Sequence, residues 1–311
     1  MNNIHFNNIL VVKHGSLGDI AFSLLAMDSI KKKFYNSKID LLTEYKYQKF
    51  LTKSNYFINI IQDNRSGIFE SLKIIFKIKK NNYDLIIDLQ NSKRTNNYWS
   101  LLKFISKVKI NGSRSNCDIR YIIPPQGSET PQRGLYNQLK LLGIDVISRD
   151  IDWLSTNVPE IKNNKIILMI PSVSKSGKHK QWSSYKYGKL ARFLEEKGYD
   201  ICIVGQESDK AAIKIIINFC TKVIDLTGKS PPEIIYSVAK NSDLIISNDT
   251  GPGHIAALSH SPILFLGINN VVSKSNLSEY KNGYRILNNS IDSLSLDYVI
   301  DFLNEKNLIT K

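Results

Sequence analysis

The change from strand to helix is clearest in the segment DLIISNDTGPGHIAAL, residues 243–258. Its first part is a short apolar run typical of a buried parallel strand, and its last part, from His254 onwards, can begin a helix. The loop between them carries a carboxylate, a hydroxyl and two glycines. Backbone N–H groups at a helix start can bind an anion, and glycine lets a ligand approach the backbone. The segment therefore predicts an α/β unit with a phosphate-binding loop, unless Asp249 or Thr250 only caps the helix.

A second junction of the same kind lies near the N-terminus. The apolar run Ile9–Val12 predicts a strand, and KHGSLGD, residues 13–19, predicts a glycine-containing loop. The segment 20–34 is long enough for a helix, and its apolar residues recur at three- and four-residue spacing. Asp19 stands at the helix start, where an aspartate can serve as the N-cap. Alternatively, it is a functional carboxylate at the carboxyl end of a strand, the edge where open α/β sheets bind ligands.

Strand and helix signals alternate along the whole chain. Strands are predicted at 38–42, 83–88, 108–110, 165–170, 199–204, 222–226, 244–247 and 262–266, with helical spacing at 68–80. Such alternation predicts parallel sheets, and 311 residues suffice for two domains of about 150 residues each. The expected join is the polar segment 148–164, which contains Pro159. We therefore predict two doubly wound α/β domains, residues 1–155 and 156–311, with a closing helix at 295–306 that packs near the join.

The charge of the chain narrows its class of partner. The formal net charge is +14, and part of it is clustered in Lys31–Lys33 and in Lys77-Ile78-Lys79-Lys80. Such a balance predicts an acidic partner, or otherwise a solubilising lysine-rich surface. Nucleic acid fits less well, because the clusters lack interleaved aromatic residues and no helix-turn-helix or zinc-finger pattern is recognisable. An anionic membrane surface or a phosphorylated, carboxylate-bearing glycolipid fits better.

Membrane-spanning and metal-binding patterns are not recognisable in the sequence. No run approaches the roughly 18 to 20 apolar residues that a membrane helix needs, and we expect no signal peptide. The cysteines Cys117, Cys202 and Cys220 lack paired metal-ligand spacing and are expected to be reduced, buried thiols of a cytoplasmic protein. Asp150-Ile151-Asp152 matches the Asp-x-Asp pattern of metal-dependent sugar transfer. It falls in the expected join, so we interpret it as coincidental.

Four short motifs occur in an order and at separations that characterise one enzyme family. They are GSLGD at 15–19, KQW at 180–182, LTGK at 226–229 and DTGPGH at 249–254. Together they resemble glycosyltransferase family 9, the heptosyltransferases that build the inner core of bacterial lipopolysaccharide. The resemblance covers nearly the whole chain, and the last motif is the most specific. It implies the GT-B fold, in which an N-terminal acceptor domain and a C-terminal nucleotide-sugar domain face each other across a cleft.

The resemblance also implies the roles of the catalytic residues. Asp19 matches the family's general base, and a carboxylate suits this role because it is ionised at neutral pH and can accept the proton of an attacking hydroxyl. One base with direct attack predicts inversion at the anomeric carbon. Lys180, Thr250 and the backbone of residues 251–254 are expected to stabilise the departing diphosphate. Several such donors would suffice without a metal, and we expect no cofactor besides the donor substrate.

Further donor-side candidates lie in loops that follow strands. They are Ser172, Ser174, Glu207, Asp249, Gly251, Gly253 and His254. Asp249 is expected to hold sugar hydroxyls or to order its loop, since a carboxylate does not attract a diphosphate. Glu207 can accept hydrogen bonds from ribose, or is simply exposed. His254 either donates to phosphate or packs in the core, and Trp182 is expected to be a packing residue.

The acceptor-side candidates are basic residues in loops of the first half together with one glycine. They are Gly18, Lys93, Arg94, Arg114 and Arg120. Guanidinium and ammonium groups pair with carboxylates and phosphates, although such residues can equally be solvated. The sequence departs from the family pattern at His14, where small or hydroxyl residues are more common, and at Pro131-Gln132-Arg133, where many members have a histidine. Both departures concern the acceptor rather than the type of reaction.

The sequence thus predicts an inverting, metal-independent heptosyltransferase of a Gram-negative cell envelope. We expect an ADP-heptose donor, an anionic glycolipid acceptor, no nucleic acid partner, and peripheral contact with the anionic cytoplasmic face of the inner membrane. Three alternatives remain open: a related transferase that uses another nucleotide sugar or a protein acceptor, a sugar-nucleotide epimerase of the same fold, and a basic nucleic-acid-binding protein. The residues themselves do not separate ADP-heptose from other nucleotide sugars.

Overall fold

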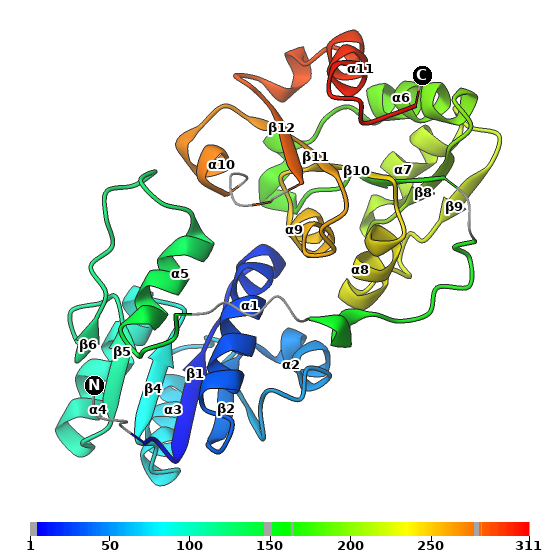
Figure 1. Ribbon diagram of the computed structural model, residues 1–311. Coiled ribbons are helices and arrows are strands. Elements are labelled where there is room, and N and C mark those ends of the chain that lie inside the picture. The colour runs from blue at the N-terminus through cyan, green and yellow to red at the C-terminus, as the bar shows by residue number, and fades with distance from the viewer. Residues whose placement is uncertain (1–4, 146–150, 163–164, 277–279, 281, 311) are drawn as a thin grey trace. The chain divides into compact units, whose positions relative to one another are not determined.

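The computed structural model describes residues 5–145, 151–162, 165–276, 280 and 282–310. The chain divides into two compact units, Met1–Trp153 and Leu154–Lys311, and each has its own sheet with helices on both faces (Figure 1). The expected boundary, between residues 155 and 156, falls close to this division. Part of the expected join, including Asp150 of the Asp-x-Asp pattern, lies outside the described residues.

The N-terminal unit contains a six-stranded parallel sheet with the strand order β3-β2-β1-β4-β5-β6. Its strands are β1 (Asn8–Val12), β2 (Lys38–Thr43), β3 (Ile60–Gln62), β4 (Leu85–Asp88), β5 (Lys109–Gly112) and β6 (Ile119–Arg120). Its helices are α1 (Leu17–Lys33), α2 (Tyr45–Thr52), α3 (Ile68–Lys80), α4 (Lys93–Ile105) and α5 (Pro131–Lys140). The direction of strand addition reverses between β1 and β4, the switch point at which doubly wound sheets bind ligands.

The C-terminal unit repeats this topology, with the strand order β12-β11-β10-β7-β8-β9 and parallel pairing throughout the described strands. The strands are β7 (Ile166–Ile170), β8 (Asp200–Ile203), β9 (Val223–Asp225), β10 (Leu244–Asn248), β11 (Ile263–Ile268) and β12 (Gly283–Asn288). The helices are α6 (Ser184–Glu196), α7 (Lys210–Ile217), α8 (Pro232–Lys240), α9 (Gly251–Ala257), α10 (Val271–Asn276) and α11 (Leu296–Glu305). Short 3-10 helices are η1 (Asp152–Leu154), η2 (Lys175–Lys180), η3 (Glu207–Asp209) and η4 (Ile291–Ser293). Here the switch point lies between β7 and β10.

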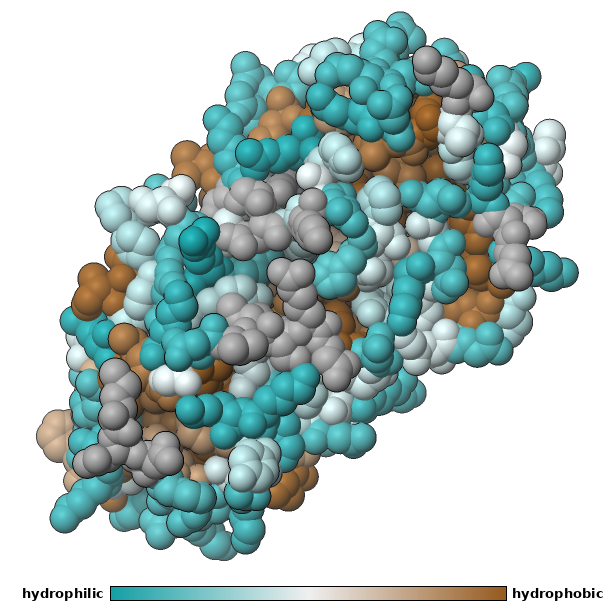
Figure 2. All heavy atoms as spheres, viewed as in Figure 1, coloured by the Kyte–Doolittle hydropathy of each residue, from teal (hydrophilic) through white to brown (hydrophobic). Residues whose placement is uncertain are grey.

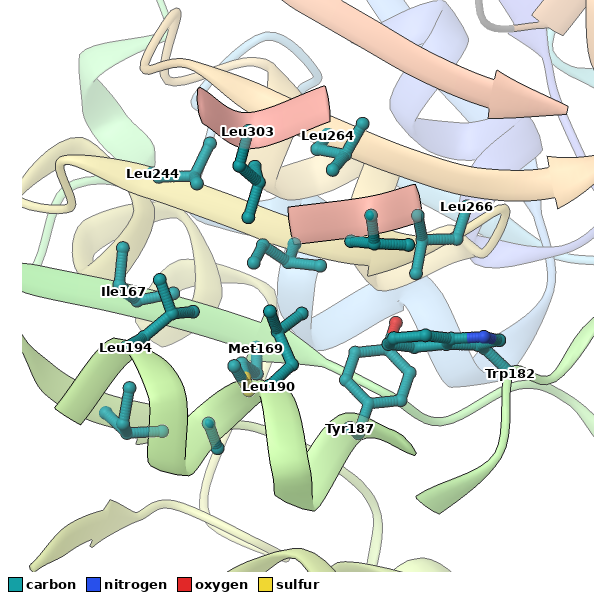
Figure 3. Close-up of a cluster of buried hydrophobic side chains, with 14 of the residues drawn as sticks. Ile167, Met169, Trp182, Tyr187, Leu190, Leu194, Leu244, Leu264, Leu266 and Leu303 are labelled. Carbon is teal, nitrogen blue, oxygen red and sulfur yellow. The ribbon is translucent and has the colours of Figure 1, made fainter. Parts of the chain in front are cut away.

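Continuous apolar runs form the central strands because helices cover both faces of each sheet. All five residues of β7 and of β10 are buried. In the C-terminal unit the strand side chains pack against α6 and α11, as seen for Leu190, Leu264 and Leu303 (Figure 3). The closing helix predicted at 295–306 is therefore present as α11, and its contacts with α6 tie it to the core of this unit.

Trp182 is a core residue of the C-terminal unit, as predicted. Its side chain is fully buried, and its ring meets that of Tyr187 edge to face with centroids 5.0 Å apart (Figure 3). Its indole Nε1 donates a hydrogen bond to the carbonyl oxygen of Leu294 at 2.9 Å. An aromatic ring with a satisfied donor is a favourable core residue. Trp182 thus fixes the loop after β7, which also carries Lys180.

In the N-terminal unit, α3 and α4 cover one face of the sheet together. Buried residues of both helices, such as Ile75, Ile78 and Leu102, join side chains of β1 and β4 in one apolar cluster. The two helices also contact each other, whereas α1 contacts α5. The remaining sides of α3 and α4 face solvent.

The three cysteines are free, with Cys117 and Cys202 buried and Cys220 half-buried. Burial raises the pKa of Cys202 to about 12 and the pKa values of Cys117 and Cys220 to about 11, so none is a reactive thiolate at neutral pH. In the part of the chain that the structure describes, no helix is both long and apolar enough to cross a lipid bilayer.

Candidate active site

The loops after β7 and β10 meet at the switch point of the C-terminal sheet. Asn248, the last residue of β10, connects them: its side-chain nitrogen donates to the carbonyl oxygen of Pro171 at 2.6 Å, and its Oδ1 accepts from the backbone N–H of Trp182 at 3.2 Å. These bonds hold the β7 loop beside Asp249. The ammonium of Lys180 consequently lies 3.1 Å from Oδ2 of Asp249. Two of the predicted motifs are therefore joined by an ion pair.

Asp249 is buried and uses both carboxylate oxygens within the protein. Besides Lys180, Oδ2 accepts a hydrogen bond from the hydroxyl of Ser273 on α10 at 3.1 Å. Oδ1 lies 3.2 Å from Nε2 of His254. Burial alone would raise the pKa of Asp249, but His254 and Lys180 outweigh it and lower this pKa to about 2. Asp249 is therefore ionised at neutral pH, and its contacts fit the expected role of ordering the loop.

The imidazole ring of His254 is buried among protein groups. Only 3% of the residue is exposed, and Nδ1 lies 2.8 Å from the hydroxyl of Tyr280. The imidazole stacks on the ring of Tyr280, with centroids 6.0 Å apart, and lies 5.5 Å from the ring of Phe265. Both ring nitrogens thus face protein partners. Of the two roles expected for His254, the geometry fits packing rather than donation to phosphate.

The start of α9 differs from an ordinary capped helix. Thr250 is the N-cap residue, but its hydroxyl accepts no hydrogen bond from the helix, and Asp249 is occupied elsewhere, so the interpretation of either residue as only a cap is wrong. Thr250 is half-buried, and its hydroxyl forms no capping hydrogen bond with α9. The helix spans only seven residues, and Pro252 in its first turn has no N–H, so its dipole adds little.

Gly253 allows α9 to pack closely on the sheet. A Cβ atom at this position would overlap the hydroxyl oxygen of Ser247 and would lie 2.9 Å from a ring carbon of Phe265. Glycine is therefore required at this point for contact between helix and strand. The side of Gly253 that lacks a side chain faces β10, in contrast to the expected approach of a ligand.

The remaining donor-side candidates lie along the same carboxyl edge of the sheet. Ser172 is buried directly after β7, whereas Ser174 is exposed at the start of η2, with its hydroxyl 3.2 Å from that of Ser176. Glu207 follows β8, is exposed and pairs with Lys210. Its carboxylate lies against Gly228 of the LTGK turn, where a side chain would overlap it. None of these contacts involves Lys180 or Asp249.

In the N-terminal unit, Asp19 lies at the switch point between β1 and β4 but does not cap α1 directly. Ser16 is the N-cap, and its hydroxyl accepts from the backbone N–H of Asp19 at 3.3 Å. In return, Oδ2 of Asp19 accepts from the backbone N–H and the hydroxyl of Ser16, both at 2.7 Å. This capping box corrects the expectation of an N-cap aspartate. Every hydrogen bond from a described residue goes to Oδ2, so Oδ1 stays available.

A buried lysine that the sequence reading missed lies close to Asp19. Lys13 directly follows β1, is 7% exposed, and donates from Nζ to the carbonyl oxygen of Leu89 at 3.1 Å. Burial lowers the pKa of Lys13, while the charges of Asp19 and Asp88 oppose this shift. The position of a lysine immediately after an apolar strand was the available signal. Gly15, with φ +114°, turns the chain between Lys13 and Asp19, where a side chain would overlap the Asp19 carboxylate.

Arg94 and His14 converge on the buried carboxylate of Asp63. One guanidinium nitrogen of Arg94 lies 3.3 Å from Oδ1 of Asp63 and 3.8 Å from Glu70, and Nε2 of His14 lies 3.3 Å from Oδ2. The hydroxyl of Tyr98 donates to the same Oδ2 at 2.8 Å. Burial alone would raise the pKa of Asp63, but the interactions with His14 and Tyr98 outweigh burial and leave this pKa below its ordinary value. The positive charge of Arg94 is therefore largely balanced by carboxylates of the protein.

The other basic acceptor-side candidates lie at the same carboxyl edge of the sheet and are not paired with a carboxylate of a described residue. Lys93 is exposed at the start of α4. The Nε group of Arg114 donates to the carbonyl oxygen of Asn91 at 2.5 Å, and that of Arg120 donates to the carbonyl oxygen of Ser113 at 3.1 Å. None of these three cations forms an ion pair with a described residue. Gly18 is buried in the first turn of α1.

Across the described ranges, no three His, Cys, Asp or Glu side chains gather closely enough to hold a metal ion. Each unit thus carries its own group of candidate residues at its switch point. Two doubly wound units in series, with polar loops at the carboxyl edges of both sheets, agree with the GT-B class of glycosyltransferases.

Comparisons with known proteins show which glycosyltransferases the chain resembles. The sequence profile of glycosyltransferase family 9 (heptosyltransferase) matches residues 138–267. The chain is 24% identical to lipopolysaccharide heptosyltransferase 3 of Escherichia coli K12, over 80% of this chain and 79% of that protein. It is also 24% identical to lipopolysaccharide heptosyltransferase 1 of Campylobacter coli, over 97% and 96% of the two chains.

A solved structure shares the fold. The E. coli heptosyltransferase WaaC with ADP superposes with a TM-score of 0.75 at 17% identity, covering 96% of this chain and 99% of that one. The resemblance to glycosyltransferase family 9 predicted from the four motifs is confirmed, and the chain is a glycosyltransferase of the heptosyltransferase type. The predicted GT-B fold is confirmed as well.

Proposed function

We propose that the protein transfers heptose from ADP-heptose to an inner-core acceptor of lipopolysaccharide, with inversion at the anomeric carbon. One observation carries the proposal: the GSLGD motif supplies an available carboxylate oxygen at one switch point, and the KQW motif supplies an ordered ammonium at the other. A base and a cation that stabilises the leaving group are what sugar transfer from a diphosphate donor requires. The named relatives are lipopolysaccharide heptosyltransferases, which supports the choice of sugar and acceptor.

In the proposed reaction Asp19 is the general base. An acceptor hydroxyl attacks the anomeric carbon, the bond from this carbon to the diphosphate oxygen breaks, and the hydroxyl proton passes to Oδ1 of Asp19. The capping box with Ser16 fixes the carboxylate through Oδ2, so the base is held in position before substrate binds. Lys13, buried directly after β1, interacts electrostatically with Asp19.

Lys180 and Thr250 stabilise the departing ADP in this proposal. Lys180 is 24% exposed at its side chain, so its ammonium can reach a ligand while Asp249 keeps it in place. The Thr250 hydroxyl is unused by α9 and can donate to a phosphate oxygen. Hydrogen bonds to charged groups contribute roughly 1.5 to 3 kcal/mol each. The chain's own donors then meet the leaving-group charge, and we propose that no metal or further cofactor takes part.

We assign the nucleotide to residues 154–311 and the acceptor to residues 1–153. Ser172, Ser174 and Glu207 follow the strands beside the Lys180–Asp249 pair and are proposed to contact the nucleoside or its phosphates. Lys93, Arg114 and Arg120 are proposed to bind acidic groups of the acceptor, because they form no ion pair with a described residue. The acceptor would be a glycolipid at the cytoplasmic face of the inner membrane.

A donor test addresses the proposal directly. Thermal unfolding is measured with ADP, UDP, GDP and a short duplex DNA, since a ligand that binds only the folded state raises the apparent stability by about 2.7 kcal/mol at a hundredfold excess over its dissociation constant. Selective stabilisation by ADP is expected, followed by heptose transfer to a heptose-deficient lipopolysaccharide. A response to UDP or GDP alone would mean that the donor is a different nucleotide sugar. Release of a free, epimerised sugar nucleotide in the absence of acceptor would mean that the enzyme is an epimerase and not a transferase.

A further inference from the structure

Seven apolar side chains on α3 and α4 lie exposed on the N-terminal unit, and we refer to this set as the α3–α4 face. The residues are Ile68, Phe69, Leu72, Phe76, Leu101, Phe104 and Ile105. Phe69 and Phe104 are 84% and 85% exposed, the highest values among the large hydrophobic residues described. Apolar residues interrupt the hydrophilic surface at several places on both units (Figure 2). A gathering of this size on two adjacent helices exceeds the scattered exposure that is normal for soluble surfaces.

The spacing of these residues gives each helix a continuous apolar stripe. On α3, residues 68, 72 and 76 recur every fourth position, and on α4 residues 104 and 105 follow residue 101 at three- and four-residue spacing. The opposite sides of both helices are buried against the sheet, through residues such as Ile74, Ile78 and Leu102. Because α3 and α4 contact each other and cover the same face of the sheet, both stripes point away from the core. The stripes are additional to the amphipathic pattern that folding requires.

The charges around the stripes are predominantly positive. Exposed lysines on or just beyond the two helices are Lys73, Lys77, Lys79, Lys80, Lys93 and Lys107. The single carboxylate within α3 and α4 is that of Glu70, which accepts hydrogen bonds from the loop at Asn64 and Ser66 and lies near Arg94. Lys103 pairs with Asp118 outside the helices at 3.1 Å. The α3–α4 face therefore combines protruding aromatic rings with unbalanced ammonium groups.

We propose that the α3–α4 face docks on an anionic phospholipid bilayer. The phenyl rings and aliphatic side chains enter the boundary between headgroups and acyl chains, while the lysines lie against lipid phosphates. A second copy of this chain is a poorer occupant, because pairing two such faces would bring the lysine clusters together. Only the purpose of this docking rests on the proposed function: an enzyme that modifies a glycolipid reaches its acceptor from the membrane surface.

Vesicle flotation tests the docking surface without requiring catalysis. The full chain is mixed with phosphatidylcholine vesicles that contain either 30% phosphatidylglycerol or no anionic lipid. We expect binding to the anionic vesicles only. Phe69→Ser combined with Phe104→Ser should weaken this binding at least about a hundredfold, because each ring buried in the bilayer contributes about 1.5 kcal/mol or more. Lys77→Glu combined with Lys80→Glu should weaken it about thirty-fold or more, since each lysine contributes about 1 kcal/mol.

Control variants with the same types of substitution elsewhere show whether the position of the substituted residues matters or only the change in composition. Tyr298→Ser removes an aromatic ring of the C-terminal unit that is 57% exposed, and Lys189→Glu combined with Lys214→Glu changes the net charge by the same amount. The proposal predicts near wild-type binding for both controls. Equal losses in test and control variants, or wild-type chain that fails to float with anionic vesicles, would overturn it. A dimer that the phenylalanine variants dissociate in size-exclusion chromatography would also overturn it, in favour of self-association.

The thermal shift with ADP distinguishes this proposal from the proposed function. The four test substitutions are at exposed positions away from the donor loops, so each variant should keep the wild-type response to ADP. Loss of vesicle binding with a retained nucleotide response assigns the defect to docking. Vesicle binding without any nucleotide response would instead leave the docking surface in place and remove the donor assignment.

Discussion

The two units use the same topology, yet the carboxylates at their switch points have opposite surroundings. Asp19 shares one oxygen with its own helix start and keeps the other available, whereas Asp249 gives both oxygens to distant partners and is almost completely buried. A carboxylate with a free oxygen can accept a proton, and one enclosed by a cation and an imidazole can only hold its neighbours in place. The position in the fold therefore does not decide the role; the contacts do.

The largest expected effect comes from removing the charge of Asp19. Asp19→Asn keeps an amide oxygen that can accept from Ser16, so the helix start should survive. Turnover should fall roughly 10²- to 10⁴-fold, the range typical of a general base, with nearly unchanged ADP affinity and melting temperature. Steady-state kinetics and calorimetric titration with ADP measure both quantities. Wild-type turnover by this variant would remove Asp19 as the base.

The corresponding change in the other unit should act on stability. Asp249→Asn leaves the ammonium of Lys180 without its counter-charge and His254 without its acceptor. We expect the free energy of unfolding to fall by about 2 to 3 kcal/mol, because the remaining partners of a buried pair lose their compensation. Urea denaturation measures this loss, and Asp19→Asn serves as the matched control. If both variants were equally stable, the distinction between the two carboxylates would fail.

The pH dependence of stability sharpens the same distinction. The pKa of Asp249 is lowered to about 2 in the folded chain from 3.8, so its contribution is complete above the unfolded value and disappears as the pH falls through the folded value. This shift corresponds to about 2 kcal/mol. Wild type should therefore lose about that much more stability than Asp249→Asn between pH 4 and pH 2. Parallel stability curves of the two proteins would contradict the burial and pairing of Asp249.

The sequence predicted the elements that carry strong apolar runs and missed those that do not. The strands around Ile9–Val12, Leu85–Asp88 and Leu244–Asn248 are buried and mainly aliphatic, and each was expected at its place. The missed strands are β3, β6 and β12, which are short or carry polar residues at the edge of a sheet. Edge strands lack the continuous apolar pattern because one side of them is open.

The same limit applies to the candidate site. Ser16 and Asp19 stand three positions apart, so their capping box was readable from local sequence. The contacts of Asp249 with Lys180 and Ser273 join three loops that are distant in the chain. No local pattern states which lysine or serine will close on a given carboxylate, because this depends on how the sheet is ordered. Asp63 was missed for a related reason, since it follows the unrecognised strand β3.

Two arginines of the N-terminal unit offer the smallest and most specific test. Arg120 is exposed and without an ion pair among the described residues, whereas Arg94 is held by Asp63 and Glu70. Arg120→Ala should raise the acceptor KM about three- to ten-fold at unchanged stability, as expected for the loss of one exposed charged contact. Arg94→Ala should instead lower the free energy of unfolding by about 1 kcal/mol, because Asp63 loses one of several partners. Acceptor titrations and urea denaturation of both variants decide between these outcomes. The reverse pattern would move the acceptor site from the loops after β5 and β6 to the start of α4.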